Sequence, residues 1–266
     1  MLFSSSPRSS NVGTARASQL ISALDEGSER IVDVELGRYD DTQPDGFHQV
    51  PMRLAQYLEW LRSDRPDGRI SGKQVYLAQW SGHGEASPSC SAVREIAVPP
   101  PILSTLITDG HVDMYQSALF LGPTGAVTPL HYDPYINLFH LQASSAPDEY
   151  AKHVFLLPPT ASPYVNGTGA RKRQKNTATV DFRIHLGPSH VIPHLQVAME
   201  ASQALVSDAV DAIESSAVTC VLREGETLYI PRGWWHRVEN IAMHGGSGKQ
   251  AGWTAGVSWW FLPRRQ

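Results

Sequence analysis

Cysteine is nearly absent from this chain of 266 residues, which contains only Cys90 and Cys220. Two cysteines are too few for a disulfide framework, and they lack the paired spacing of a zinc site. We therefore expect each of them to be an ordinary core or surface residue in a reducing compartment.

Long hydrophobic runs are also missing. No stretch approaches the roughly 20 apolar residues that cross a bilayer, and the first residues lack the apolar run of a secretory signal. We expect a soluble intracellular protein of the cytoplasm or nucleus that does not bind membranes. Mitochondrial targeting is a weaker alternative, because residues 1–18 are rich in serine, include Arg8 and Arg16 and have no acidic residue.

The sequence has no large excess of charge of either sign. It has 22 Lys and Arg against 26 Asp and Glu, which gives a net charge of -4. This balance disfavours nucleic acid as a partner, since phosphate backbones attract basic surfaces. The one short basic run, RKRQK at 171–175, is typical of a solvated loop. At this length and with 41% hydrophobic residues, the chain can bury one sizeable core.

Turn residues and short apolar runs indicate the organisation of the chain. Helices are predicted at 17–26 and 52–63, with a strand at 30–36 between them. From Gln74 onward, short β-rich runs separated by Gly and Pro favour an antiparallel barrel or sandwich. Residues 1–16 are predicted to be a disordered N-terminus and residues 17–266 a single domain. Residues 160–216 interrupt the strand pattern as a partly helical insertion, with a helix expected at 197–213.

One face of a predicted strand carries two groups that can bind a metal. His131 and Asp133 stand two residues apart, so both side chains point to the same side of the strand. His236 follows a later apolar strand and a Pro/Gly corner. Two imidazoles and one carboxylate form the facial triad of non-haem Fe(II) oxygenases, which leaves metal positions open.

Each of these residues also has a structural interpretation. A single H-x-D pair occurs by chance, and His140, His153 and His185 on plausible strands are assigned ordinary structural roles. Lys152 begins a later strand and is a candidate partner for a carboxylate. A surface lysine at a strand entrance is the alternative for that residue.

Five ordered motifs resemble those of the JmjC family of oxygenases that use Fe(II), 2-oxoglutarate and O2. The resemblance is greatest to the small hydroxylase branch, which includes arginyl hydroxylases and the asparaginyl hydroxylase of hypoxia-inducible factor. The motifs are VYLAQW (75–80), GPTGAVTPLHYDPYINLF (122–139), KHVFLLPP (152–159), GETLYIPRGWWHRVEN (225–240) and GVSWWF (256–261). The resemblance implies a mainly β fold, a double-stranded β-helix of the jelly-roll or cupin-like JmjC type with flanking N-terminal helices.

The resemblance also implies a role for individual residues. His131, Asp133 and His236 correspond to the iron ligands. The expected contacts of 2-oxoglutarate are Lys152 at its distal carboxylate, Thr128 and Tyr76 as hydroxyl partners of that end, Asn137 at the chelating end, and Ser258 in the same pocket. Trp259 is a candidate wall of the pocket, although an aromatic residue at this spacing is more often core.

Two departures from the family pattern affect the walls of the expected pocket but none of the three expected iron ligands. The hairpin between Gln142 and Lys152 is longer than usual, and so is the link from Pro158 to the strand before His236. The position of Lys152 therefore rests on its constant distance from Pro158 and Pro159.

The predicted function is hydroxylation of a protein or peptide side chain, with release of succinate and CO2. Alternatives are a lysine demethylase, a hydroxylase of a tRNA base, a non-catalytic cupin-like binding module and a cupin isomerase with another metal. We expect a monomer, because related barrels dimerise through helices after the last strand and the sequence ends five residues beyond Phe261.

Overall fold

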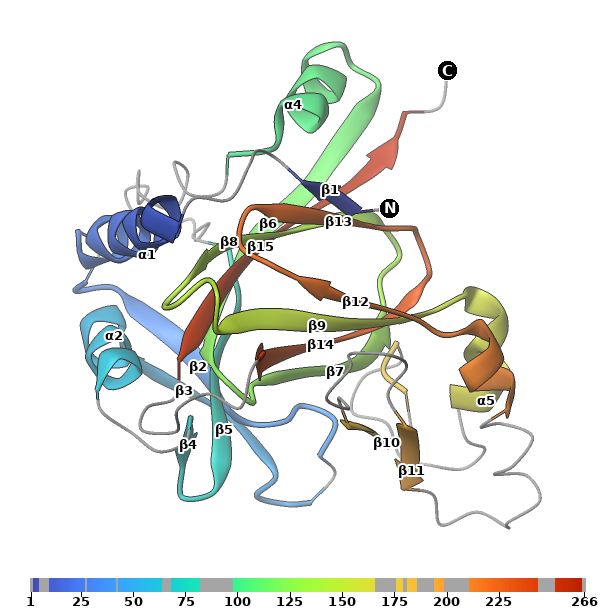
Figure 1. Cartoon of the computed structure of the whole chain (residues 1–266), viewed down its shortest axis with the longest axis horizontal. Helices are drawn as coiled ribbons and strands as arrows, with labels where there is room; N and C mark the ends of the chain where they lie inside the picture. The colour runs from blue at the N-terminus through green and yellow to red at the C-terminus, as the bar shows by residue number, and fades with distance from the viewer. Residues whose placement is uncertain are drawn as a thin grey trace.

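A computed structural model shows the arrangement of the chain (Figure 1). It describes residues 2–4, 10–26, 28–41, 43–63, 68–81, 98–165, 176–178, 181–185, 194–198, 211–243 and 252–264. No helix among these residues is long and apolar enough to span a membrane.

The described strands form two facing antiparallel sheets and one separate hairpin. The larger sheet contains, in spatial order, β1 (Leu2–Ser4), β13 (Glu226–Ile230), β8 (Ile136–Ser144), β15 (Trp253–Pro263), β6 (Val112–Pro123), β5 (Lys73–Trp80), β2 (Ile31–Gly37) and β3 (Phe47–Arg53), with β4 (Arg69–Ile70) beside β5. The smaller sheet has the order β12 (Val218–Leu222), β9 (Tyr150–Leu157), β14 (Trp235–Ala242) and β7 (Val127–Tyr132).

The chain passes from one sheet to the other as it runs through β6, β7, β8 and β9, and again through β12, β13, β14 and β15. This alternation is the topology of a jelly roll, in which two sheets close around a shared interior. The structure thus confirms the predicted mainly β, cupin-like fold.

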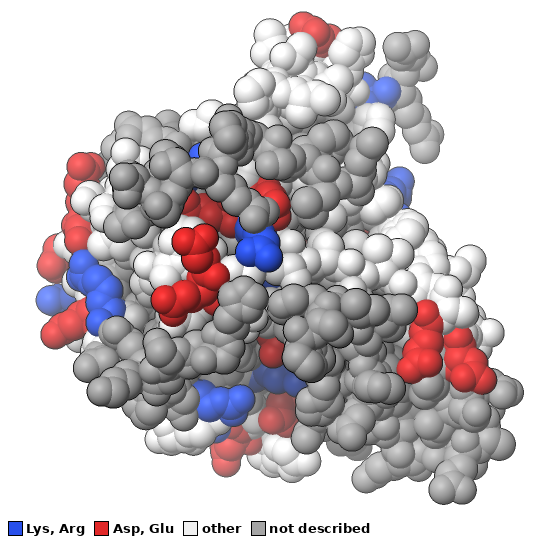
Figure 2. Space-filling model, viewed as in Figure 1, with Lys and Arg blue, Asp and Glu red and all other residues white. Residues whose placement is uncertain are grey.

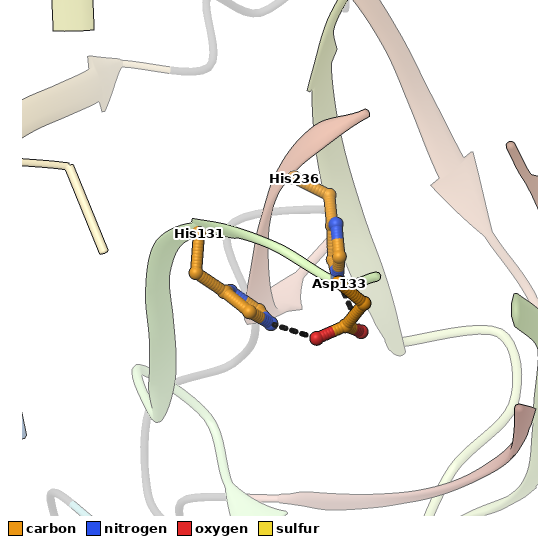
Figure 3. A group of neighbouring side chains, drawn as sticks. All are labelled: His131, Asp133 and His236. Atoms are coloured by element: carbon orange, nitrogen blue, oxygen red, sulfur yellow. Dashed lines mark ion pairs between the residues drawn. The ribbon is translucent and has the colours of Figure 1, made fainter. Parts of the chain in front are cut away.

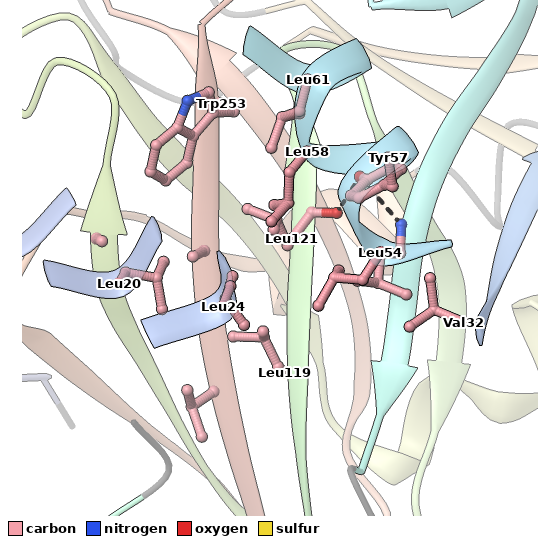
Figure 4. Packing of buried hydrophobic residues seen from close by; sticks show 14 of the residues in the cluster. Leu20, Leu24, Val32, Leu54, Tyr57, Leu58, Leu61, Leu119, Leu121 and Trp253 are labelled. Atoms are coloured by element: carbon pink, nitrogen blue, oxygen red, sulfur yellow. Dashed lines mark hydrogen bonds between the residues drawn. The ribbon is translucent and has the colours of Figure 1, made fainter. Parts of the chain in front are cut away.

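The central strands of the larger sheet, such as β8 and β15, are buried on both faces, in agreement with their few polar residues. Its inner face contributes Phe120, Phe139 and Trp260 to the core between the sheets. Its outer face is covered by α1 (Ser10–Asp25) and α2 (Leu54–Arg62), whose leucines pack against it (Figure 4). Tyr57 of α2 donates a hydrogen bond to the Leu121 carbonyl at 2.6 Å, which fixes the helix on the sheet.

The N-terminal region differs in part from the prediction. The strand expected at 30–36 corresponds to β2, and the helix expected at 52–63 corresponds to α2. The helix expected at 17–26 begins earlier, because α1 starts at Ser10, and residues 2–4 pair with β13. Disorder over residues 1–16 therefore does not describe these segments. The free edge of β13 supplies backbone partners that the local sequence does not reveal.

The region expected as an insertion contains short elements around the smaller sheet. These are η1 (Pro159–Ala161), α5 (Ser162–Val165) and the hairpin of β10 (Asp181–His185) with β11 (His194–Ala198). The helix expected at 197–213 overlaps β11 at its start and a helical segment, residues 211–216, at its end, and the positions between lie outside the described residues. The basic run at 171–175 also lies outside them.

On the face drawn in Figure 2, the described acidic and basic side chains occur in small separate groups among uncharged residues.

A helix, α4 (Pro101–Thr108), precedes β6 and covers its outer side near the chain end of β15.

Candidate metal centre

Three side chains meet where two neighbouring strands of the smaller sheet end. His131 on β7 lies opposite His236 on β14 in the strand register, and Asp133 follows β7 directly. One ligand atom from each residue lies within 4.8 Å of the others. The Asp133 carboxylate is 3.9 Å from His131 Nε2 and 3.6 Å from His236 Nε2 (Figure 3). The strand pairing therefore brings His236 next to His131 and Asp133, which precede it by about a hundred positions in the sequence.

Hydrogen bonds to the backbone orient both imidazole rings. His131 Nδ1 lies 2.8 Å from the Pro129 carbonyl and His236 Nδ1 lies 3.0 Å from the Trp234 carbonyl. Because a carbonyl only accepts, each Nδ1 carries the hydrogen, and each Nε2 keeps a free lone pair. Figure 3 shows both rings directed toward the Asp133 carboxylate. This tautomer is the one that binds a metal through Nε2.

The electrostatics of the three groups favour a bound cation. Burial and the neighbouring His131 together lower the pKa of His236 to about 4, so this imidazole is neutral near pH 7. Burial acts to raise the pKa of Asp133, but His236, His131 and a hydrogen bond from Trp260 together lower it. The His236 imidazole and the Asp133 carboxylate are thus available to a metal without loss of a proton. This donor set suits a divalent transition metal with open positions.

A pocket adjoins the three residues and lies between the two sheets. His131 and His236 line it together with four residues expected at the cosubstrate: Tyr76, Thr128, Asn137 and Ser258. Thr128 is hydrogen-bonded to Tyr76. The rest of the lining is largely apolar and comprises Phe120, Phe139, Ile230, Val238 and Trp260, with Gln79 as the other polar member. Such a lining excludes water around a small number of polar groups.

Lys152 lies behind this lining and is fully buried. Its Nζ is 5.8 Å from the ring centroids of both Tyr76 and Phe139. It donates a 2.7 Å hydrogen bond to Asn240 Oδ1. Burial lowers the pKa of Lys152 to about 7. The structure thus excludes the surface-lysine alternative and places the amine next to the pocket.

Two features near Lys152 were not assigned from the sequence. Asn240 ends the motif that contains His236, and its amide donates to the carbonyls of Gly122 and Pro123 at 2.9 and 3.0 Å. Gly256 on β15 leaves room for the lysine, because a Cβ there would lie 2.7 Å from the Phe139 ring and 3.0 Å from Lys152 Cε. The sequence could have indicated Asn240, because it is the last residue of the motif at 225–240 that also contains His236.

The structure corrects the suggested role of Trp259. This residue packs in the outer core under the helices and is 1% exposed, as the core alternative proposed. Trp260 lines the pocket instead and donates a 2.7 Å hydrogen bond from Nε1 to Asp133 Oδ2. Because side chains alternate along β15, Ser258 and Trp260 share the inner face.

The structure assigns none of the other histidines noted in the sequence to this group of described ligands. His140 Nδ1 is 2.9 Å from Thr227 Oγ1, and burial lowers its pKa to about 4. His153 is a buried residue of β9 and His185 belongs to β10. Among the described residues, His131, Asp133 and His236 form the only group of three potential ligands. Cys220 forms no disulfide, whereas Cys90 lies outside the described part of the chain.

Two segments that carry no family motif border the centre. Residues 176–178 run beside β7, where Thr177 bridges to His131 and Asn176 bonds the backbone of Tyr132. On the other side, the Tyr39 ring lies edge-on to the His131 ring at 6.3 Å, and its hydroxyl donates to the Pro129 carbonyl at 3.3 Å.

Glu35 is a further polar group near the pocket. It lies on β2 opposite Tyr76 of β5, and its charge acts on both Tyr39 and Tyr76. Burial raises its pKa to about 7. The sequence identified this strand but gave no reason to select the residue, because its position depends on how β2 pairs.

The sequence is similar to a known domain family and to known proteins. The model of a cupin-like domain matches residues 14–266. Lysine-specific demethylase JMJ30 of Arabidopsis thaliana is 27% identical over 220 residues, which is 80% of this chain and 41% of that protein. Lysine-specific demethylase JMJ32 of the same plant is 28% identical over 152 residues, 54% of this chain and 40% of the relative. The chain thus spans about two fifths of each of these relatives.

Proposed function

Since the chain belongs to the family of cupin-like domains and its matches confirm the resemblance to JmjC proteins, we propose that it is an Fe(II)- and 2-oxoglutarate-dependent dioxygenase. Its substrate is a protein or peptide side chain, which it hydroxylates with release of succinate and CO2. The observation that carries the proposal is the pocket between the sheets. This pocket adjoins the His-Asp-His group, and the fully buried Lys152 lies behind its lining. A metal site alone would not require such a lysine.

Each side chain has a defined part in this function. His131, Asp133 and His236 hold Fe(II), which when bound supplies the activation of O2 for attack on a C–H bond. Asn137 and Ser258 contact the chelating end of 2-oxoglutarate. Tyr76 and Thr128 donate to its distal carboxylate, and the Lys152 ammonium pairs with that carboxylate in a setting with little water. The apolar lining keeps solvent from the reacting atoms.

The pKa of Lys152 predicts how cosubstrate binding depends on pH. The amine is charged below about pH 7 and neutral above it, whereas the distal carboxylate pairs with the charged form. We expect the affinity for 2-oxoglutarate to be constant below about pH 7 and to fall about tenfold per pH unit above it, because binding then takes up a proton. Titration of 2-oxoglutarate into the Mn(II)-loaded protein from pH 6 to 9 measures this.

The matched control is Lys152→Arg, whose guanidinium stays charged over the whole range. Its affinity is expected to be lower than that of the wild type at pH 6, but nearly independent of pH. An equal decline in both proteins would assign the pH dependence to the metal centre rather than to the lysine.

The surroundings of the pocket favour a basic substrate side chain. On the β2 side of the centre, the Tyr39 ring lies beside His131, and the charge of Glu35 acts on Tyr39. Together they offer a carboxylate and an aromatic edge. A guanidinium or ammonium group of the substrate would form an ion pair with the half-buried Glu35 carboxylate. Without such a partner, burial disfavours the charged form of this carboxylate. The same site accepts an N-methylated lysine, so a demethylase is the second candidate, and both relatives are named as lysine demethylases.

Glu35→Gln provides a test of this substrate preference. The variant removes the charge but keeps the shape, so we expect about tenfold weaker use of peptides with a basic target residue. Turnover of 2-oxoglutarate without peptide should not change. Asp33→Asn is the control, since it removes the same charge from an exposed position on the same strand. Equal kinetics of Glu35→Gln and Asp33→Asn would exclude a role for Glu35.

One assay separates the candidate functions. The protein is incubated with Fe(II), ascorbate, 2-oxoglutarate and a peptide library that contains arginine, lysine and methyl-lysine targets. Succinate together with a peptide that gains one oxygen atom indicates a hydroxylase, and succinate with formaldehyde indicates a demethylase. Succinate only with a tRNA substrate would favour a base hydroxylase. No succinate above the metal-free control would leave a binding module or an isomerase.

A further inference from the structure

Asp133 differs from the two histidines in how it is held. It follows the end of β7 and is not part of a strand ladder, and its side chain is 17% exposed. Its carbonyl accepts a hydrogen bond from the Gly233 amide at 3.0 Å, which fixes the backbone. The direction of the carboxylate about its own bonds requires a separate contact.

Trp260 supplies that contact from the opposite sheet. Its Nε1 donates to Asp133 Oδ2 at 2.7 Å, within the normal range of a charge-assisted hydrogen bond. The indole position is itself fixed, because Trp260 lies opposite Asn137 on β8 and Gln116 on β6. Its ring packs edge-on against Phe120 with centroids 6.1 Å apart and is 8% exposed.

The backbone next to this contact is also unusual. The pairing of β15 with β6 shifts in register after Trp260, so Tyr115 is an extra residue between Gln116 and Met114. The Tyr115 ring stacks on Tyr135, two residues after Asp133, with centroids 4.1 Å apart. The bulged residue of β6, Tyr115, therefore contacts the turn that carries Asp133, and it lies beside the strand that carries Trp260.

We propose that Trp260 is a positioning residue that holds one oxygen of Asp133, so that the other oxygen alone serves the metal. This inference rests on the proposed metal centre. A carboxylate that rotates freely can bind a metal through both oxygens and occupy an additional coordination position. The donated N–H occupies one lone pair of Oδ2, lowers the basicity of this oxygen and favours the monodentate form. The positions needed by a chelating oxo-acid and by dioxygen then stay available.

A purely structural role of Trp260 is the competing explanation. In that case the indole fills the wall beside Phe120, and its N–H is incidental. The two explanations predict opposite rankings for a pair of variants. Trp260→Phe keeps an aromatic ring but removes the donor, whereas Trp260→Gln loses the ring but keeps an amide donor of similar reach. If Trp260 only packs, Trp260→Phe should resemble the wild type more closely. If Trp260 positions Asp133, Trp260→Gln should bind metal better than Trp260→Phe.

The experiment is a titration of the metal-free protein with Co(II), followed by the d–d absorption bands, which report both affinity and coordination number. We expect Trp260→Phe to bind Co(II) about 10- to 100-fold more weakly than the wild type, with altered band intensities. Trp260→Gln should bind more tightly than Trp260→Phe although it unfolds at a lower temperature. Trp259→Phe, in the outer core, is the matched control and should leave the Co(II) spectrum unchanged.

A second measurement uses the wild-type chain and does not depend on the folding of a variant. With indole-15N tryptophan, one of the 7 indole N–H resonances should be protected from exchange and should shift when Zn(II) is added and in Asp133→Ala. Absence of such a resonance, or wild-type Co(II) affinity and spectrum in Trp260→Phe, would overturn the inference. Failure of the wild type to bind Co(II) would instead refute the proposed metal centre.

Discussion

His131→Ala and Asp133→Ala are each expected to abolish succinate formation. Either change leaves two ligands, which hold Fe(II) weakly and no longer in the facial arrangement that keeps positions open for cosubstrate and dioxygen. The effect should be visible both in turnover and in Fe(II) or Co(II) binding, while the thermal unfolding of the metal-free protein changes little. Measurement of succinate release at saturating Fe(II) provides the test.

A histidine outside the centre gives the matched control for these variants. His48 lies on β3, and 46% of its side chain is exposed, so His48→Ala should keep full activity. Asp133→Gly is also informative, because the vacated position could accept a halide but should not support normal hydroxylation. Full activity of His131→Ala or Asp133→Ala would remove the assignment of the triad.

Lys152→Ala is expected to have the largest effect on cosubstrate binding. Its ammonium lies in a fully buried position, and its removal leaves the distal carboxylate of 2-oxoglutarate without a cationic partner in an apolar setting. The cost is about 2–5 kcal/mol, or roughly 30- to several-thousand-fold in affinity. Metal binding should survive, since the lysine does not contact the three ligands. Titration of 2-oxoglutarate into the Mn(II)-loaded variant measures the loss.

Two variants control for this result. Lys152→Arg should restore affinity only in part, because a planar guanidinium replaces a compact charge on a different stem. Lys73→Ala removes an amine that bonds a backbone carbonyl of Asp45 and should have no effect. Unchanged affinity in Lys152→Ala would require another cation. Arg237 is nearly buried and already paired with Glu239 at 2.7 Å, so the described structure does not offer it as a free substitute.

The parts of the fold and site that sequence predicts are those set by local spacing. The two-residue interval of His131 and Asp133 places them on one side of a strand regardless of what packs around it. Gly and Pro turns mark the ends of short apolar runs, so strands β5, β6, β8, β9, β13 and β15 were predicted in order. Strands β10 and β11 lie in the region that was expected to be a partly helical insertion. The distance of Lys152 from Pro158 directed attention to this residue although its hairpin is longer than in the family, and the structure places it buried beside the pocket.

Features that depend on long-range pairing were not predictable. Trp259 and Trp260 are neighbouring residues of the same type, but their surroundings differ. Only the register of β15 against β8 decides which of the two side chains faces the pocket. The place of Glu35 depends on the pairing of β2 with β5. Similarly, β1 is a strand only because the edge of β13 accepts it, since three residues carry too little pattern of their own.

The glycine beneath the buried lysine has a consequence for the divergence of related sequences. A side chain at position 256 would overlap the Phe139 ring and the end of the Lys152 stem. Position 256 should therefore change together with both position 139 and position 152 during evolution. Homologues that retain phenylalanine at position 139 and lysine at position 152 should be restricted to glycine at position 256, whereas alanine or serine there should require a smaller residue at position 139. An alignment of many homologues would show this as covariation among three positions that are distant in sequence.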